Sequence, residues 1–421
     1  MNKRSFIKTT LAATYNAINF AGDTLNIEED YRPDAVIRQD TRDAAYRAQV
    51  VYNNKIDVRN TFRAGIIASH LRFNYKEMHY DEPADQFVEG LALDGSNNYY
   101  QAFAQWKHRA GNNFTLAGGL HGTYLDVNDT WSIEPRASVQ YRPDNIQTFT
   151  LAAGLHTRPE HLSTYYFQPM GSSPGSAPNR ELELPKAIHT VVGYERAMGK
   201  GITLKAEAYF QHLYDIGVEA IDNSEFSLIN QSSFWDLIDK APLVSTGKGR
   251  NAGIDLSVEK PLRNGTYYLL TASLFTSTYT NYSNNRFNTR FDRGYQTNLV
   301  AGKEWKVNGK PNRIWGLNGK LLASGGLRNS PIDLEASKAA GKRVPVTNKY
   351  FTESGPMYFR SDLSVSYKIN GKNVTHTFMV DIQNVTGRRN LFFEYYDNDT
   401  QTIKRADQMG MIPVVNYRIE F

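Results

Sequence analysis

The feature that most constrains the fold of this chain is a repeated alternation of apolar and polar residues. Residues 133–141, 202–211, 254–259 and 362–369 each place an apolar side chain at nearly every second position. Successive side chains of a β-strand point to opposite faces, so each segment predicts a strand with one apolar and one polar face. The polar positions include the charged residues Glu134, Arg136, Lys205, Glu207, Asp255, Glu259, Asp362 and Lys368.

The length and spacing of these segments favour a membrane barrel over a soluble β-sandwich. Strands of soluble sandwiches also alternate, but they usually have about 5–6 residues, and three of these four segments extend further. Short links rich in Gly, Asn and Pro predict tight turns at 53–57, 109–113, 142–145, 198–201, 261–265, 307–312 and 370–373. Long links are predicted near 19–44, 74–97, 157–186, 215–249, 279–293, 325–356 and 386–407. The link at 126–130 is short where a long one is expected.

Short periplasmic turns and long extracellular loops are typical of outer-membrane β-barrels. The pattern therefore predicts an all-β, antiparallel transmembrane β-barrel of about sixteen strands, with both chain ends on the periplasmic side. Residues 1–421 show no second domain and no linker, so we expect one barrel region. Two long links are expected to carry a helical turn, at Phe234–Ile238 and at Leu334–Ala340.

The composition excludes several other classes of protein. There is no run of about 18 apolar residues, which excludes a transmembrane helix. Cysteine is absent, so disulfides and thiolate metal sites are excluded. The net charge of +5 comes without a basic block, and nucleic-acid binding is therefore not indicated. No signal-peptide core follows Met1–Arg4, and we expect that a signal was removed or that the N-terminal part is missing.

The C-terminus carries the sharpest local pattern. Val415, Tyr417, Ile419 and Phe421 alternate with polar residues, and the chain ends on an aromatic side chain. A last strand of this kind resembles the signal that the outer-membrane assembly machinery recognises. Together with the preceding strands, it predicts a protein of the outer membrane of a Gram-negative cell.

Longer segments in the second half of the chain carry a resemblance to a known family. They are Val191–Glu219, Gly247–Lys260, Gly325–Asp333, Asp381–Asp397 and Gln408–Phe421. In order and in length, they resemble Bacteroidetes-type TonB-dependent outer-membrane receptors. The resemblance covers most of the chain from about Leu182 onward.

The resemblance implies a barrel of about 22 strands that is filled by an N-terminal plug domain. It implies uptake of a nutrient such as a glycan, an iron chelate or a peptide, energised by the TonB complex through the plug. Outer-membrane lipid and a surface lipoprotein lid are further partners that it implies. The chain departs from this pattern because it has no plug, no TonB-contacting segment and roughly six strands too few. We therefore expect the barrel region of a truncated receptor.

Two other functions compete with the receptor. A passive porin-like diffusion channel agrees with a barrel of about sixteen strands. An enzyme needs a nucleophile or an acid–base pair, and no such constellation is found. Gly171–Gly175 matches G-x-S-x-G, but Pro174 lacks the N–H that an oxyanion hole requires.

Neither a cofactor nor a metal site is predicted. The glycine-rich segment Gly247–Gly253 precedes a strand, whereas a dinucleotide loop follows one and opens a helix. Glycines that enter a curved barrel strand are the simpler interpretation. His156 and His161 flank a segment that contains Pro159, and this spacing fixes no metal geometry. We interpret both as histidines of a solvent-facing loop.

Aromatic residues gather in two of the predicted extracellular loops. Such clusters can contact a sugar ring or another flat ligand, and they can equally belong to the aromatic girdle at the membrane interface. The candidates for ligand contact are Tyr165, Tyr166, Phe167, Phe392, Phe393, Tyr395 and Tyr396.

Overall fold

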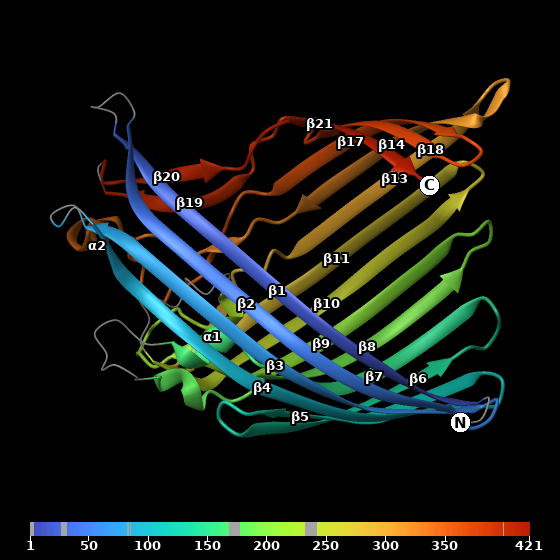
Figure 1. The fold of residues 1–421 in the computed structure, drawn as a ribbon, viewed down its shortest axis with the longest axis horizontal. Helices are drawn as coiled ribbons and strands as arrows, with labels where there is room; N and C mark the ends of the chain where they lie inside the picture. Colours follow the sequence, from blue (N-terminus) through green and yellow to red (C-terminus); the bar gives the residue numbers. More distant parts are fainter. Residues whose placement is uncertain are drawn as a thin grey trace. The chain divides into compact units, whose positions relative to one another are not determined.

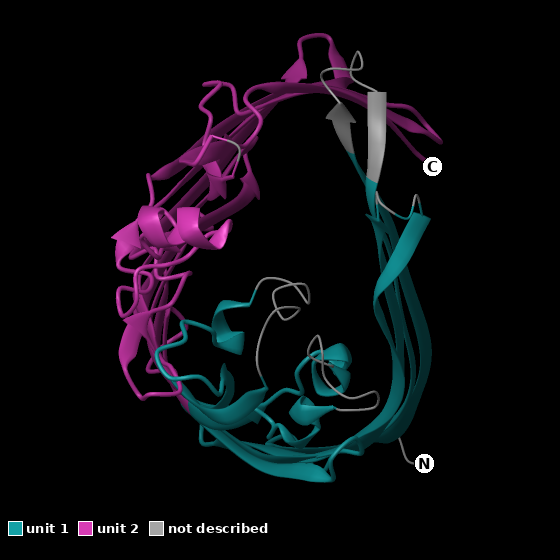
Figure 2. Cartoon of the chain, turned by 90° about the vertical axis from the view of Figure 1, so that its left-hand side faces the viewer, with its two compact units in different colours: residues 1–139, 153–188, 213–248 teal, residues 140–152, 189–212, 249–421 magenta. Residues whose placement is uncertain are grey.

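The computed structural model describes residues 4–26, 32–81, 84, 86–167, 177–231, 242–398 and 400–421. Within these residues, 17 strands are joined in one antiparallel sheet, and two further pairs of short strands lie outside it (Figure 1). The chain forms two compact units (Figure 2). The first has residues 1–139, 153–188 and 213–248, and the second has residues 140–152, 189–212 and 249–421.

The first unit is built on five antiparallel strands that pair in chain order. They are β1 (Ser5–Asn26), β2 (Arg32–Lys55), β3 (Asn60–Asp81), β4 (Gln86–Ala110) and β5 (Phe114–Leu125). Three short helices lie on one face of this unit's sheet (Figure 2), namely α1 (Leu162–Tyr166), η1 (Pro178–Glu181) and η2 (Leu228–Asn230). In this unit we call this face the inner face. On the strands of the second unit, the outer face is the one that carries exposed apolar side chains such as Ile254 and Leu274, and the inner face is the opposite one.

Five strands contribute residues to both units. They are β6 (Thr130–Tyr141), β7 (Gln147–Thr157), β8 (Lys186–Ala197), β9 (Thr203–Glu219) and β10 (Leu243–Arg263). Each is a regular strand of the main sheet.

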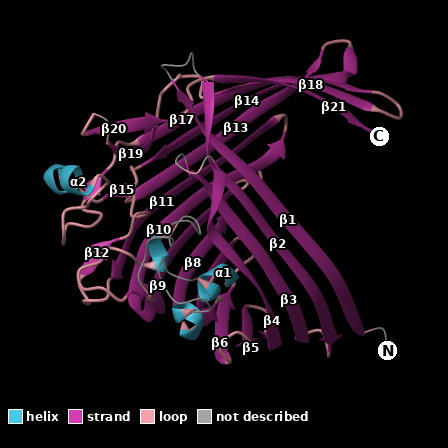
Figure 3. Cartoon of the chain, turned by 60° about the vertical axis from the view of Figure 1, so that its left-hand side comes forward, coloured by secondary structure: helices cyan, strands magenta, loops and turns pink. Residues whose placement is uncertain are grey.

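The second unit continues the antiparallel pattern. Its strands are β11 (Thr266–Thr280), β12 (Arg286–Asn288), β13 (Tyr295–Val307), β14 (Lys310–Ser324), β17 (Tyr358–Asn370), β18 (Thr375–Gln383) and β21 (Ile412–Glu420). β11 pairs with β13, and pairing continues through β14, β17 and β18 to β21. Outside the sheet, β15 (Arg328–Asn329) pairs with β16 (Glu353–Ser354), and β19 (Leu391–Asp397) pairs with β20 (Thr402–Asp407). Along the chain, the helix α2 (Leu334–Ala340) stands between β15 and β16, and Figure 3 shows it near β15.

The strand count agrees with the sequence-based prediction. When the three-residue strand β12 is set aside, sixteen of the 17 strands of the main sheet remain. The predicted short links are confirmed as turns. The clearest case joins β10 to β11, where Asn264 and Gly265 both have positive φ, at 54° and 72°. A two-residue hairpin of this kind needs Asn and Gly because other side chains are strained there.

Two predicted long loops are wrong. Most of residues 19–44 and 74–97 belongs to the extended strands β1 to β4. Inside a membrane the outer face of a strand must be apolar, but beyond it that face contacts water and can be polar, so the alternation that marks a strand is lost. Backbone pairing nevertheless continues there, for example between Asp40 and Lys76.

The other long links are confirmed as connections, and so is the short link at 126–130 between β5 and β6. The helical turn predicted at Leu334–Ala340 coincides with α2. Its N-cap Asp333 accepts a hydrogen bond from the backbone N–H of Ala336 at 3.0 Å, which satisfies one free helical donor. The predicted turn at Phe234–Ile238 and the G-x-S-x-G match at Gly171–Gly175 lie outside the described residues.

The predicted alternation of faces is confirmed in the strands. The apolar residues Ile133, Ile254 and Leu363 are exposed. Their polar neighbours Glu134 and Asp255 lie on the opposite face, Glu134 fully buried among polar partners and Asp255 in a hollow. In the described part of the chain, no helix is long and apolar enough to cross a membrane.

A hydrophobic core occupies the inner face of the first unit. Side chains from β3, β4 and β5 pack there against α1 and the segments around η1 and η2. Its fully buried rings and aliphatic groups include Phe73, Leu125, Tyr165, Phe167 and Leu184. This core holds the connecting segments against the sheet.

Candidate ligand-binding site

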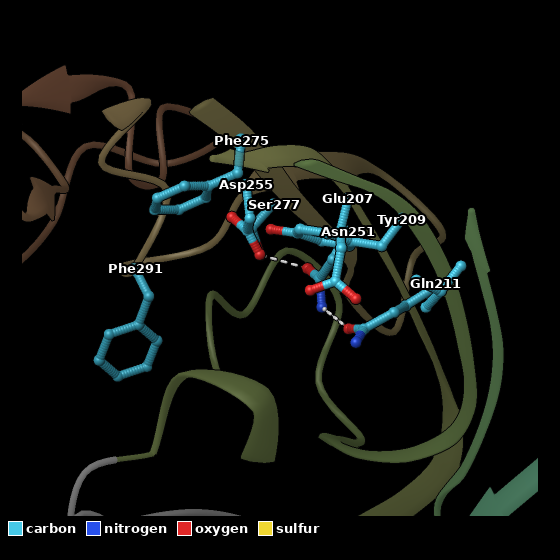
Figure 4. Close-up of a pocket in the computed structure, with 9 residues that line it drawn as sticks. Glu207, Tyr209, Gln211, Asn251, Asp255, Phe275, Ser277 and Phe291 are labelled. Atoms are coloured by element: carbon cyan, nitrogen blue, oxygen red, sulfur yellow. Dashed lines mark hydrogen bonds between the residues drawn. The ribbon is translucent and has the colours of Figure 1, made fainter. Parts of the chain in front are cut away.

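A hollow of about 450 Å³ lies on the inner face of β9, β10 and β11, within the second unit (Figure 4). Alternate residues of β9 contribute Glu207, Tyr209 and Gln211, which is the spacing that puts side chains on one face. The remaining lining residues are Val191, Asn251, Asp255, Phe275, Ser277 and Phe291. The alternation that predicts the strands therefore also places these side chains together on one face.

A chain of uncharged hydrogen-bonding groups fixes one side of the hollow. The Asn251 side-chain amide donates to Gln211 Oε1 at 2.9 Å, and Ser277 Oγ donates to Asn251 Oδ1 at 2.7 Å (Figure 4). Thr289 Oγ1 donates to Ser277 Oγ at 2.8 Å. Each partner limits the rotamers of the next, so the polar groups are held in position before any ligand binds.

The charge of the hollow is acidic. Lys205 Nζ lies 2.7 Å from Glu207 Oε2, and this ion pair compensates one carboxylate. For Asp255, no hydrogen bond or ion pair is found among the described residues, and no Lys or Arg belongs to the lining. One uncompensated carboxylate therefore faces the hollow.

Gly253 makes room for the Tyr209 side chain. A Cβ atom at position 253 would lie 2.6 Å from the Tyr209 hydroxyl oxygen and 2.8 Å from the Leu274 carbonyl oxygen. Both distances are shorter than real Cβ contacts, so only glycine fits. This agrees with the interpretation of Gly247–Gly253 as strand glycines. A Cβ atom at position 247 would likewise lie 2.6 Å from Val218 Cγ1 and 2.8 Å from the Ile216 carbonyl oxygen of β9.

The candidate aromatic residues of α1 are mostly interior. Tyr165 and Phe167 are 0% and 1% exposed within the hydrophobic core. Tyr166 packs against the same core, and its hydroxyl donates to the Ser96 carbonyl oxygen at 2.9 Å. These rings anchor the segment to the sheet, and a ligand would reach Tyr165 or Phe167 only if the segment moved.

The segment before α1 is tied to β2 and β3 by polar contacts. The Tyr75 hydroxyl donates to Asp43 Oδ1 at 3.0 Å and lies 3.3 Å from His161 Nε2. His161 Nδ1 is 2.8 Å from Ser163 Oγ. Burial raises the pKa of the nearby Glu160 carboxyl, although Arg158 opposes the shift. These contacts tie His161 to the sheet, while its side chain remains 53% exposed, in agreement with the predicted solvent-facing position.

Metal ligation is not indicated by the described geometry. Within the described residues, no three His, Asp or Glu side chains come together as a metal site. His161 contacts Tyr75 and Ser163, as set out above, and its Nε2 lies 3.5 Å from Asp43 Oδ1. The contact with Asp43 is an ion pair only when the histidine is protonated.

The second group of candidate aromatic residues lies on the hairpin of β19 and β20. Phe392, Phe393 and Tyr395 are exposed, and Tyr396 is buried. The ring centroids of Phe392 and Phe393 are 5.1 Å apart, and those of Phe393 and Tyr395 are 5.8 Å apart. The structure thus groups three exposed rings on this hairpin, and ligand contact by them stays a prediction.

A row of five aromatic residues crosses the outer face of the second unit. Register places them directly opposite one another on β13, β14, β17, β18 and β21 as Trp305, Trp315, Tyr367, Phe378 and Tyr417. Trp and Tyr prefer the boundary between hydrocarbon and water. Tyr417 also belongs to the C-terminal pattern, whose Val415, Ile419 and Phe421 are exposed as well.

Long antiparallel strands with an exposed apolar face, bordered by an aromatic row, define an outer-membrane β-barrel. The protein resides in the cell outer membrane and crosses it many times with its strands. The chain belongs to the family described as "TonB dependent receptor-like, beta-barrel", whose model matches residues 3–385. Members of this family are receptors and transporters.

Solved structures show the same fold at low identity. The chain is similar to FpvAI in "Structure of the FpvAI-pyocin S2 complex", with TM-score 0.69, 11% identity, and 99% of this chain and 55% of that chain covered. The ferric yersiniabactin uptake receptor FyuA from Yersinia pestis gives TM-score 0.68 and 12% identity, covering 100% and 60% of the two chains. The ferric preacinetobactin receptor BauA from Acinetobacter baumannii gives 0.65 and 12%, covering 100% and 61%. The chain therefore spans little more than half the length of these relatives. No curated protein matches it.

Sequence reasoning found some lining residues of the hollow and missed others. Glu207 and Asp255 were assigned to the polar face from the alternation alone. Asn251, Phe275, Ser277 and Phe291 were not singled out, because their meeting depends on how neighbouring strands are staggered. A search for inward-facing amides next to glycines would have found Asn251.

Proposed function

We propose that this chain forms the barrel wall of a Bacteroidetes-type TonB-dependent transporter that takes up a nutrient across the outer membrane. The family match supports the transporter class. The observation that carries the proposal is the hollow on the inner face of β9 to β11, where ordered polar groups and aromatic rings face away from the lipid. Such a lining suits a pathway for a solute.

In this proposal, residues 1–421 act as one barrel region, and a plug domain couples it to the TonB energy complex. The exposed aromatic residues of β19 and β20 contact the nutrient or a surface lipoprotein lid. Val415, Tyr417, Ile419 and Phe421 are recognised by the outer-membrane assembly machinery. The nutrient belongs to one of three classes: glycans, iron chelates or peptides.

The test is growth of a strain that lacks the gene encoding this chain. The strain is supplied with a glycan digest, a ferric chelate or a peptide mixture as its limiting nutrient. We expect one of the three to support growth poorly, and we expect deletion of TonB or addition of a protonophore to reproduce the defect. Complementation with the intact gene is the control. A defect that neither treatment reproduces would contradict energised transport.

A passive channel is the second candidate, because sixteen long strands also occur in porins with an open lumen. It predicts conductance by the refolded chain alone in a planar bilayer, after a heat-shift gel has verified folding. Stable and uniform channels, together with uptake that persists without TonB, would favour this function over the transporter. Erratic leaks or no conductance would favour the transporter.

A further inference from the structure

The inner-face hollow of β9 to β11 combines two kinds of surface that face each other. Figure 4 shows the rings of Phe275 and Phe291 on one side, and Glu207, Tyr209, Gln211 and Asn251 on the other. Phe291 lies in the link between β12 and β13, and its side chain is exposed. A ligand in this hollow therefore meets flat apolar faces and polar atoms at the same time.

The polar side offers both donors and acceptors, and its one uncompensated charge is the Asp255 carboxylate. Gln211 Oε1 is occupied by Asn251, and among the described residues no hydrogen bond is found for the Gln211 amide N–H groups. The Asp255 carboxylate likewise has no described partner and accepts only. A hydroxyl group both donates and accepts, so neighbouring hydroxyls can bond to an amide and to a carboxylate at once.

The charges of the lining argue against an anionic iron chelate and against a cationic peptide side chain. An anionic iron chelate would meet the uncompensated Asp255 carboxylate, and the hollow has no Lys or Arg in its lining to offset the repulsion. A cationic peptide side chain would be attracted to Asp255. Such a cationic side chain would bind to the carboxylate alone, and the hydrogen-bonded residues Gln211, Asn251 and Ser277 would take no part in its recognition.

We infer that this hollow is a binding subsite for one sugar unit of a neutral oligosaccharide. The hydroxyls bond to Gln211, Asn251 and Asp255, and an apolar ring face stacks on Phe275 or Phe291. The inference rests on the proposed transport function and narrows its substrate to the glycan class. The ordering of Asn251 by Ser277 and Gln211 lowers the cost of binding, because the polar groups already hold their positions.

The experiment measures binding to the refolded 421-residue chain in detergent by saturation-transfer NMR and titration calorimetry. The neutral probes are maltopentaose, cellopentaose, xylopentaose and mannopentaose. Trilysine and a ferric tris-catecholate are the charged comparators. We expect at least one neutral probe to bind, and we expect neither charged comparator to compete with it.

Three variants locate the binding. Gln211→Ala and Phe291→Ala are each expected to raise the Kd of the bound oligosaccharide about tenfold or more, which is the loss of one good contact. Gln296→Ala is the matched control, because Gln296 is also an exposed inner-face amide, on β13, and does not line the hollow. Its Kd is expected to be unchanged. A heat-shift gel verifies that each variant folds.

The remaining outcomes overturn the inference. These are no binding of any neutral probe, equal binding by all variants, or binding of trilysine that is lost in Asp255→Asn. Failure of the sugar-subsite inference is distinguishable from failure of the proposed transport function. If only the inference fails, growth on a ferric chelate or a peptide still depends on the gene and on TonB. If the transport function fails, the growth defect does not depend on TonB.

Discussion

Glu134 is the sharpest test of how the polar face of the barrel is stabilised. Its side chain is 0% exposed, although it carries a carboxylate. Arg136 donates to Oε2 at 2.5 Å, Thr157 donates to Oε1 at 2.6 Å, and His121 Nδ1 lies 3.1 Å from Oε1. The substitution Glu134→Ala removes the shared acceptor of Arg136 and Thr157 and the carboxylate that lies beside His121, and it leaves a small void there.

The magnitude follows from the two hydrogen bonds to a charged group. Such bonds contribute about 1.5–3 kcal/mol each, so their loss sets a range of roughly 3–6 kcal/mol. The Arg136 side chain is 43% exposed and regains water when its partner is removed, which lowers the cost. We therefore expect Glu134→Ala to reduce the free energy of unfolding by about 3 kcal/mol, and Glu134→Gln by less.

The assay is guanidinium unfolding of the refolded chain in detergent, followed by tryptophan fluorescence. Glu259→Ala is the matched control, because Glu259 is a predicted polar-face glutamate that is exposed, and no hydrogen bond or ion pair is found for it among the described residues. Its effect is expected to stay within about 0.5 kcal/mol. If Glu134→Ala costs less than about 1 kcal/mol, the argument from buried acceptors is refuted.

Three further predictions use other parts of the molecule. Gly253→Ala should lower the free energy of unfolding by about 1–3 kcal/mol, because the added Cβ meets the Leu274 carbonyl oxygen. Gly118→Ala should be close to neutral, because the nearest atom to a Cβ added there is 3.9 Å away. Equal effects of the two substitutions would contradict this reasoning. The hydroxyl of Thr400 and the amine of Lys404 lower the pKa of Asp397 to about 2. The stability that Asp397 contributes to the β19–β20 hairpin is therefore present above its ordinary pKa of 3.8 and is lost as pH falls toward about 2. Hydrogen exchange of the hairpin should show this loss, and Asp397→Asn should remove the pH dependence. Lipids brominated near the headgroup should quench the fluorescence of Trp305 and Trp315 more than lipids brominated at the bilayer centre. The reverse order would contradict the placement of the aromatic row at the membrane boundary.

The sequence predicted the strands of the membrane-crossing part well, because lipid on one side imposes strict alternation. Leu363 and Val365 alternate with Asp362 and Ser364, and register and exposure both follow that pattern. The turns were equally accessible. At Asn264–Gly265, the need for positive φ restricts the residue types, and the same restriction makes the turn visible in the sequence.

The failures have a common physical cause. Beyond the membrane the outer face of β2 contacts water, so polar residues such as Arg42 and Asp40 stand there and carry no sign of a strand. The aromatic residues of α1 posed a related problem. Tyr165 and Phe392 look alike in a sequence, but Tyr165 is buried in the core and Phe392 is exposed, and only the tertiary packing decides between them.

The binding hollow needed information that no single segment contains. Gln211, Asn251 and Ser277 are on three strands, and their hydrogen bonds depend on the stagger between those strands. Periodicity indicates which face a residue occupies but does not indicate its height along the barrel wall. Sites built across neighbouring strands therefore remain hidden from a strand-by-strand analysis.

The length of β3 and β4 has a consequence for what the cell displays. β4 has 25 residues, and at about 3.4 Å per residue it measures roughly 85 Å. An apolar band about 25 Å tall takes up only about 35 Å of a strand tilted by about 45°. The remainder stands clear of the headgroups, where antibodies, phages and neighbouring cells make first contact. A short peptide tag inserted at Ala84, in the link between these two strands, should therefore be detectable on intact cells while the membrane-embedded strands remain undisturbed.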